Sequence, residues 1–229
     1  MTEQFKISLI VGDRGTGKTG TLIRKILPAY IVRRAIAKKV IRVAVVDLER
    51  NYNYEDFECL KDPAYPDPRK ILLRRYVKLP VPVISRQQLP GLASGIVRVL
   101  PGNEPAGDFA GEVFNQVCYD TRIHDCLIAI EDSARFMPDN NRFDTDLRNM
   151  IINSKQRAMD IVFMFHYWSD VPPKLLRWID QVYLHKCDES VKIREKLWSE
   201  VKVARILDAE KKLKTVPNRY HSELIVLNH

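Results

Sequence analysis

The sequence has little that would tie it to a membrane or to the secretory pathway. Its longest apolar stretches fall well short of the roughly 20 residues that a membrane span requires, and no basic-then-apolar signal pattern opens the chain. The four cysteines form no C-x-x-C pair, so neither a zinc site nor a disulfide framework is expected. No internal repeat or low-complexity tract occurs. These absences predict a soluble, cytoplasmic protein with reduced cysteines and no membrane span.

The length and the order of elements indicate the fold class. A chain of 229 residues can bury one sizeable core, so we expect a single domain over residues 1–229. Strand-like and helix-like segments alternate, which is typical of an α/β fold with a mainly parallel central sheet and helices on both faces. The core is expected from about residue 6 to residue 186, followed by a basic helix and a short terminal strand within residues 188–229.

The charge balance is basic, with 37 Lys and Arg against 29 Asp and Glu. No acidic residue occurs between Gly20 and Val46, whereas seven basic residues do: Arg24, Lys25, Arg33, Arg34, Lys38, Lys39 and Arg42. The stretch "RKILLRR" (residues 69–75) and the segment Lys192–Lys214 are also basic. Such clusters favour nucleic-acid phosphates as a partner, and a charged surface that only keeps the protein in solution is the alternative.

A phosphate-binding loop stands near the N-terminus. The stretch "VGDRGTGKTG" satisfies G-x-x-x-x-G-K-[ST] and follows the strand-like run "KISLIV". The expected nucleotide-binding residues are Gly12, Asp13, Arg14, Gly15, Thr16, Gly17, Lys18, Thr19 and Gly20. The glycines let backbone N–H groups face phosphate oxygens at a helix N-terminus. Lys18 is expected to reach the β- and γ-phosphates, and the Thr19 hydroxyl to bind Mg²⁺.

Two adjacent acids follow a second apolar strand. In "DCLIAIEDSARF", residues 127–130 form the expected strand and deliver Glu131 and Asp132 to its carboxyl end. In P-loop NTPases one acid at this place holds the Mg²⁺ shell and a second can activate the attacking water. A strand that ends in a solvated acidic turn is the alternative. The combination with the P-loop favours the catalytic interpretation, a Walker B motif.

The other elements are expected as follows. The helix that begins at Lys18 should end or kink at Pro28 and then resume. The run "IRVAVVDLE" is a strand that ends at Asp47, and the proline-rich region Asn51–Pro90 should hold loops and short strands. Helices are expected in "LPGLASGIVRVL" (89–100), "DFAGEVFNQVCYDTR" (108–122) and "DTDLRNMIINSKQRAM" (144–159). The strand "DIVFMFHYW" then ends in His166, where a sensor of the γ-phosphate or of the attacking water would sit, although a structural histidine is the alternative.

The order "GDRGTGKT", "LIAIED", "SKQRAMDIVFMFHYWSDVPPKLLRWIDQVYLHK" resembles the FtsK/HerA superfamily of additional-strand catalytic-glutamate ATPases. Within it the chain is similar to small genome-packaging ATPases of tailless double-stranded DNA viruses and to zonular-occludens-toxin-like ATPases of filamentous phages. The resemblance implies ATP and Mg²⁺ as cofactors and a sensor strand inserted between the P-loop and Walker B strands. It also implies double-stranded DNA as a partner, with capsid or membrane-associated viral proteins as further candidates. The expected location is the host cytoplasm or the capsid vertex.

The resemblance further implies a homo-oligomeric ring, a pentamer or hexamer, with active sites shared between subunits. A neighbouring subunit would then supply a positive charge to the transition state. The candidates are Arg135, Arg142, Arg148 and Arg157, with Arg157 and Arg148 in the helix before the sensor strand favoured. A surface salt bridge is the alternative role for each.

The acid order departs from the family pattern. Aspartate then glutamate is usual, whereas Glu131 precedes Asp132 here. Register puts Glu131 on the Mg²⁺ position and Asp132 on the base position, and both acids are kept as a pair. The sensor position, commonly Gln or Asn, is His166.

Other functions fit the motifs less well. A switch GTPase would use "DFAG" (108–111) and "NRFD" (141–144), but neither follows an apolar strand. A small-molecule kinase, a DNA-binding module with a relic P-loop, and a phage-export or mobile-element DNA-pumping ATPase are further alternatives. The sequence favours an ATP hydrolase that translocates double-stranded DNA into a viral capsid.

Overall fold

The computed structural model describes residues 5–48, 80–136, 141–192 and 198–227. This part of the chain forms an eight-stranded sheet with the order β3-β4-β2-β5-β6-β1-β7-β8. The strands are β1 (Ile7–Val11), β2 (Arg42–Val46), β3 (Val83–Ile84), β4 (Gly95–Val99), β5 (Leu127–Ile130), β6 (Asp160–Phe165), β7 (Gln181–Leu184) and β8 (Glu223–Val226). Neighbouring strands are parallel except β7 and β8, which are antiparallel.

The centre of the sheet matches the expected arrangement. Strand β6, which carries the sensor position, lies between β5 and β1, so it separates the Walker B strand from the P-loop strand. Leu9 of β1 pairs with Phe163 of β6 and Val182 of β7. Every residue of β1, β5, β6 and β7 is buried, because helices cover both faces of a parallel sheet. These apolar runs are therefore recognisable in the sequence.

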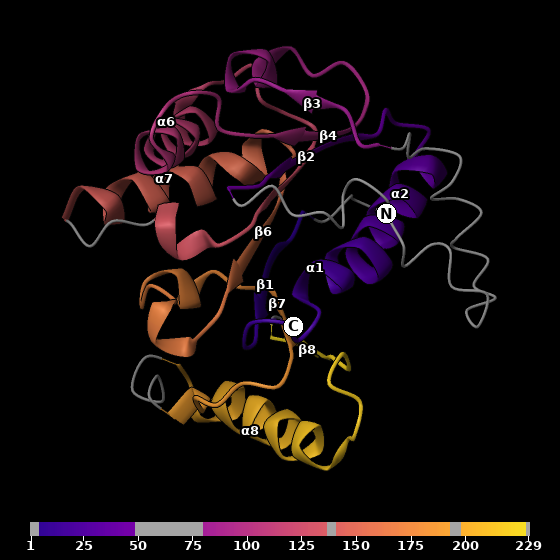
Figure 1. The fold of residues 1–229 in the computed structure, drawn as a ribbon, viewed down its shortest axis with the longest axis vertical. Helices are drawn as coiled ribbons and strands as arrows, with labels where there is room; N and C mark the ends of the chain where they lie inside the picture. Colours follow the sequence, from indigo (N-terminus) through magenta and orange to yellow (C-terminus); the bar gives the residue numbers. More distant parts are fainter. Residues whose placement is uncertain (1–4, 49–79, 137–140, 193–197, 228–229) are drawn as a thin grey trace.

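The helices and turns are α1 (Lys18–Thr21), η1 (Leu22–Ile26), α2 (Leu27–Ile36), η2 (Arg86–Gly91), α6 (Ala106–Tyr119), η3 (Ser133–Phe136), α7 (Asn141–Gln156), η4 (Trp168–Asp170), η5 (Leu175–Arg177) and α8 (Glu200–Thr215). Figure 1 shows α6 and α7 on one side of the strands and α1 and α2 on the other.

Successive residues of the strands belong alternately to two hydrophobic cores, one on each face of the sheet. Leu9 belongs to the core that α6, α7 and α8 cover, whereas Ile10 belongs to the core under η1 and α2. This division follows from the two-residue period of a strand. The terminal helix α8 contributes Ile206 and Leu213 to the first core, and β8 forms the edge of the same sheet. The C-terminal elements are thus packed into the α/β architecture.

The helix that follows the P-loop does not end at Pro28, but its hydrogen-bond register changes just before that residue. The chain runs from α1 through the five π-helical residues of η1 into α2, with Pro28 in the first turn of α2. The backbone N–H of Leu27 donates to the carbonyl of Leu22, five residues back. This change of register falls beside the one residue that has no N–H to donate, which explains how the helix tolerates proline there.

The expected helix over residues 89–100 is wrong. The short 3₁₀ turn η2 ends at Gly91, and Gly95–Val99 forms β4. Its β-branched residues Ile96, Val97 and Val99 are buried, which suits a pleated strand between β2 and β3. The segment "DFAGEVFNQVCYDTR" does form a helix, α6, and the strand expected before Asp47 is β2.

No helix in the described part of the chain is long and apolar enough to cross a membrane. Cys118 and Cys126 are buried free thiols and Cys187 is a partly buried one, as expected for reduced cysteines. Burial raises the pKa of each of these three thiols to about 12. Cys59 lies outside the described residues.

Candidate active site

The P-loop turns between the end of β1 and the start of α1. Gly15 (φ 72°) and Gly17 (φ 90°) have left-handed backbone conformations, which glycine adopts without strain. A Cβ on Gly12 would collide with the Cβ of His185, so the close approach of β7 also requires glycine. The Thr16 hydroxyl donates to the carbonyl of Asp13 at 2.8 Å, which closes the turn.

The ammonium group of Lys18 is held over the loop. Its Nζ donates to the carbonyl oxygens of Gly12 (2.5 Å) and Asp13 (2.9 Å) and lies 2.8 Å from Nδ1 of His166. Because an ammonium group only donates, Nδ1 accepts and the proton of the neutral imidazole is on Nε2. Burial lowers the pKa of Lys18 to about 8, although the carboxylates of Asp13 and Glu131 oppose that shift. The structure thus brings together the P-loop lysine and the sensor position.

Thr19, in α1, and Glu131, directly after β5, are in contact. The Thr19 hydroxyl donates to Oε1 of Glu131 at 2.9 Å, and Glu131 is only 8% exposed at the end of β5. A hydroxyl and a carboxylate are hard oxygen ligands, and Mg²⁺ usually takes one or two such groups together with phosphate oxygens and water. These two residues therefore fit a Mg²⁺ site. Gly20 follows in α1, with open space beside it.

Asp132 takes a different direction from Glu131. Its backbone is left-handed (φ 47°), so the chain leaves the strand line directly after Glu131. Its carboxylate forms an ion pair with Nε of Arg135 at 2.7 Å. The buried hydroxyl of Ser133 fixes the turn, because it donates to the carbonyl of Ile130 and accepts from the N–H of Met164. The two acids are thus held in separate positions at one sheet edge.

Two acids beside the site were missed from the sequence: Asp188, which follows β7, and Asp170, at the end of η4. The backbone N–H of Asp188 donates to both carboxylate oxygens of Asp13, at 3.1 and 3.3 Å. Asp170, near His166, has a raised pKa because of its burial first and the charge of Glu189 second. No local motif identified Asp170 or Asp188, because strand order brings them close to His166 and Asp13. The segment "DVPP" that begins at Asp170 was only part of the family resemblance.

Arg157 lies at the C-terminal end of the helix before the sensor strand, where its backbone N–H donates to the carbonyl of Asn153 at 2.8 Å. α7 ends at Gln156, and Arg157 precedes β6, at the sheet edge opposite the P-loop. Its guanidinium donates to the carbonyl oxygens of Asp120 (2.8 Å), Ile123, Val117 and Cys118 at the C-terminal end of α6. These contacts satisfy carbonyls that a helix end leaves without partners.

An Arg157→Ala variant is expected to lose about 1 to 3 kcal/mol of unfolding free energy, because several buried carbonyl groups lose a charged donor. Chemical denaturation would measure this change. The matched control is Arg148→Ala, an exposed arginine of α7, which should change stability by no more than about 0.5 kcal/mol. Unchanged stability of Arg157→Ala together with lost ATP turnover would instead favour a trans-acting role.

The remaining arginine candidates have different surroundings. Arg135 is part of the pair with Asp132, and Arg148 is exposed on α7. The side chain of Arg142 lies outside the described residues. The GTPase alternative fails on geometry, because "DFAG" lies inside α6 and "NRFD" begins α7, so neither follows a strand end.

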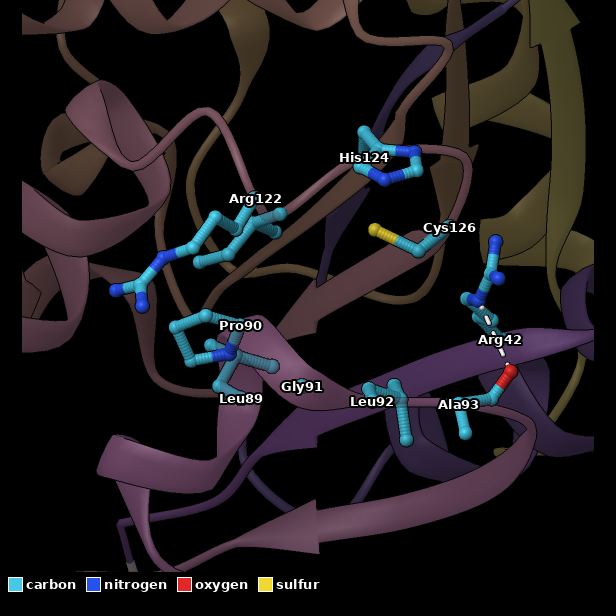
Figure 2. A pocket seen from close by; sticks show the side chains of 10 residues that line it. Arg42, Leu89, Pro90, Gly91, Leu92, Ala93, Arg122, His124 and Cys126 are labelled. Carbon is cyan, nitrogen blue, oxygen red and sulfur yellow. Dashed lines mark hydrogen bonds between the residues drawn. The ribbon is translucent and has the colours of Figure 1, made fainter.

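A cavity lies at the edge of the sheet where the parallel strands begin (Figure 2). Its volume is about 220 Å³, and its lining includes Arg42, at the start of β2, and Arg122, His124 and Cys126, which precede β5. Parallel strands begin at one edge and end at the other, whereas the P-loop follows the end of β1. No P-loop residue lines this cavity. It is therefore separate from the candidate active site.

The fold and the loop geometry define an α/β P-loop NTPase. The chain resembles the genome packaging NTPase B204 from Sulfolobus turreted icosahedral virus 2, solved with ATPγS: TM-score 0.59, 12% identity, covering 97% of this chain and 92% of that one. The same protein with AMPPCP gives a TM-score of 0.60 at 13% identity, with 97% and 92% covered.

The structure of B204, the DNA-packaging ATPase from Sulfolobus turreted icosahedral virus, gives a TM-score of 0.57 at 11% identity, covering 98% of each chain. No known family profile matches the sequence. No curated protein matches it either. The comparisons thus confirm the α/β P-loop NTPase fold, and the strand order of this chain has β6 between β5 and β1 as expected.

Proposed function

We propose that this protein hydrolyses ATP and uses the energy to translocate double-stranded DNA into a viral capsid. The observation that carries the proposal is the convergence of Lys18, His166, Thr19 and Glu131 at the carboxyl ends of adjacent strands, joined by contacts of 2.8 to 2.9 Å. The B204 proteins that share the fold are described as packaging NTPases, and structures of one of them hold ATP analogues.

In this proposal the P-loop positions the triphosphate. The N–H groups of the loop bind its oxygens, and the Lys18 ammonium turns from the carbonyls of Gly12 and Asp13 to the β- and γ-phosphates. Thr19 and Glu131, which are in contact with each other, would hold Mg²⁺. When bound, the ion would neutralise negative charge on the phosphate oxygens.

Asp132 and His166 act on the attacking water. The carboxylate of Asp132 accepts a proton from the water as its oxygen bonds to the γ-phosphorus, and the bond from that phosphorus to the β,γ-bridging oxygen breaks to release ADP. His166, whose Nδ1 accepts from Lys18, has its Nε2–H left to donate to a γ-phosphate oxygen or to the water. The direct contact between His166 and Lys18 lets the sensor strand respond to the phosphate that Lys18 binds. Mechanical coupling from β6 to a neighbouring subunit would start at this contact.

The positive charge for the transition state is assigned to a neighbouring subunit in a homo-oligomeric ring. Arg148 is the better candidate of the two favoured arginines, because it is exposed on α7 whereas the guanidinium of Arg157 is bound to α6. The ring would be a pentamer or hexamer in the host cytoplasm or at the capsid vertex, in contact with capsid or membrane-associated viral proteins.

The DNA surface draws on fewer basic residues than their number in the sequence indicates. Arg33 pairs with Asp160, and Arg34 and Arg42 share Asp125, so these three arginines form ion pairs within the fold with two carboxylates. The stretch at residues 69–75 lies outside the described residues. Exposed lysines on α8 remain, among them Lys212 and Lys214. These support contact with phosphate.

Binding to double-stranded DNA is expected to weaken steeply with salt, with a log–log slope near −0.9 per neutralised phosphate. If α8 contacts DNA, replacing Lys212 and Lys214 together by alanine should reduce the slope by about 1.8, whereas arginine at both positions should preserve it. Fluorescence anisotropy over a salt series with duplexes of unrelated sequence would measure both. A flat salt response, or strong preference for one sequence, contradicts the translocation proposal.

A further inference from the structure

A segment near the C-terminus lies directly against the P-loop, about 200 residues away in sequence. Nη2 of Arg219 donates to the carbonyl of Arg14 at 3.0 Å. A Cβ on Gly15 would lie 3.2 Å from the same nitrogen, and a Cβ on Gly17 would lie 3.1 Å from Cδ1 of Tyr220. Two of the P-loop glycines thus face Arg219 and Tyr220. The proposed mechanism uses neither residue.

A buried polar cluster anchors this segment. Oγ1 of Thr21 lies 2.9 Å from Nε2 of His185 and 3.1 Å from Oγ of Ser222. The ammonium of Lys25 donates to both the carbonyl and the hydroxyl of Ser222, at 2.9 and 2.8 Å. Burial lowers the pKa of His185 to about 4, so its imidazole is neutral at pH 7. The cluster joins the first helix, β7 and the residue before β8, and it fixes the chain two residues after Tyr220.

Tyr220 is not a core residue, since it is 65% exposed. The backbone is turned at this point, because the N–H of Tyr220 donates to Oδ1 of Asn218 and the N–H of His221 donates to the carbonyl of Asn218. The anchored turn therefore holds an aromatic side chain beside the loop with most of its surface open.

The sheet order indicates which part of a nucleotide would reach Tyr220. The proposed γ-phosphate and Mg²⁺ groups, His166 and Glu131, follow β6 and β5, on one side of β1. Tyr220 precedes β8, on the other side of β1, beyond β7. When the γ-phosphate of a bound triphosphate lies toward β5 and β6, its α-phosphate lies near Gly17, where α1 begins. The ribose and base then lie on the β7 and β8 side.

We propose that Tyr220 forms the base-binding subsite of the nucleotide, with its ring stacked on the purine. Arg219 lines the same edge and keeps the segment against the loop through Arg14. This inference rests on the proposed function, because it takes the P-loop to bind ATP. A stacked ring contacts the face of a base and does not distinguish its edges, so the subsite accepts adenine and guanine alike.

The test compares binding of ATP, GTP and inorganic tripolyphosphate to the full chain by isothermal titration calorimetry. Tyr220→Ala should weaken ATP and GTP about tenfold or more, within the range that base–aromatic stacking contributes, and leave tripolyphosphate unchanged. Tyr220→Phe keeps the ring and should bind ATP as the wild type does. The matched control is Leu224→Ala, because Leu224 on β8 is 49% exposed. This variant should not change the affinity for ATP or for tripolyphosphate.

Two outcomes would overturn the subsite. Wild-type ATP affinity in Tyr220→Ala shows that the ring does not stack, and equal losses of ATP and tripolyphosphate show that the residue acts only through loop shape. Failure of the proposed function gives a different result, because a wild-type chain that binds neither ATP nor tripolyphosphate has no working P-loop. Lys18→Ala distinguishes failure of the subsite from failure of the P-loop, because it should weaken the binding of both ATP and tripolyphosphate.

Discussion

A Lys18→Ala variant is expected to bind ATP about 10- to 100-fold more weakly and to lose turnover. Its ammonium lies at the centre of the site, within 2.8 Å of His166 and on the carbonyls of the loop. Losing charge-assisted hydrogen bonds to phosphate accounts for a change of this size in affinity. The loss of turnover is larger, because Lys18 stabilises charge that develops on the transferred phosphoryl group. Calorimetry and phosphate release would measure the two effects.

Lys211→Ala is the matched control for Lys18→Ala. Lys211 is an exposed lysine of α8 paired only with a neighbouring exposed acid, Asp208. This variant should hydrolyse ATP at the wild-type rate and unfold at the same denaturant concentration as the wild type. If Lys18→Ala retains wild-type turnover, the loop does not bind the triphosphate as proposed.

Glu131→Gln and Asp132→Asn are each expected to slow hydrolysis by about 10²-fold or more while ATP stays bound. Glutamine is a weaker Mg²⁺ ligand than glutamate, and asparagine cannot accept the proton of the attacking water. Single-turnover phosphate release would give the rates, and calorimetry the retained affinity. If both variants hydrolyse ATP at the wild-type rate, the Walker B assignment is wrong.

The two acid variants should differ in their response to metal. Glu131 contacts Thr19, whereas Asp132 forms an ion pair with Arg135, and this difference is why Glu131 is the proposed Mg²⁺ ligand. Glu131→Gln should therefore require more Mg²⁺ for half-maximal rate, and Asp132→Asn should keep the wild-type requirement. The reverse pattern would exchange the two roles.

Much of the fold could be predicted because local sequence determines it. The P-loop has fixed backbone demands at Gly15 and Gly17, and β5 and β6 are continuous apolar runs because both of their faces are buried. The strand β4 was mistaken for a helix, since its glycine and aliphatic residues fit either element. Pairing with β2 decided the outcome, and local propensity is too weak to oppose such packing.

The wrong or missed parts of the site depend on contacts between distant residues. Arg34 belongs to a basic run in the linear sequence, yet its guanidinium is buried against Asp125, 91 residues away. Arg157 has a helix-like sequence context but is bound to the end of α6. The contact of Arg219 with Arg14 spans 205 residues and leaves no local signal. Tertiary contacts thus separate structural from functional arginines here.

The proposed function requires that this site hydrolyse ATP and that the hydrolysis be coupled to translocation of DNA. The most direct test is phosphate release from ATP by the full chain with Mg²⁺, with and without double-stranded DNA of several unrelated sequences. The account predicts hydrolysis that every duplex stimulates to a similar degree and that Lys18→Ala abolishes. DNA binding with no hydrolysis, or hydrolysis that DNA leaves unchanged, would contradict it.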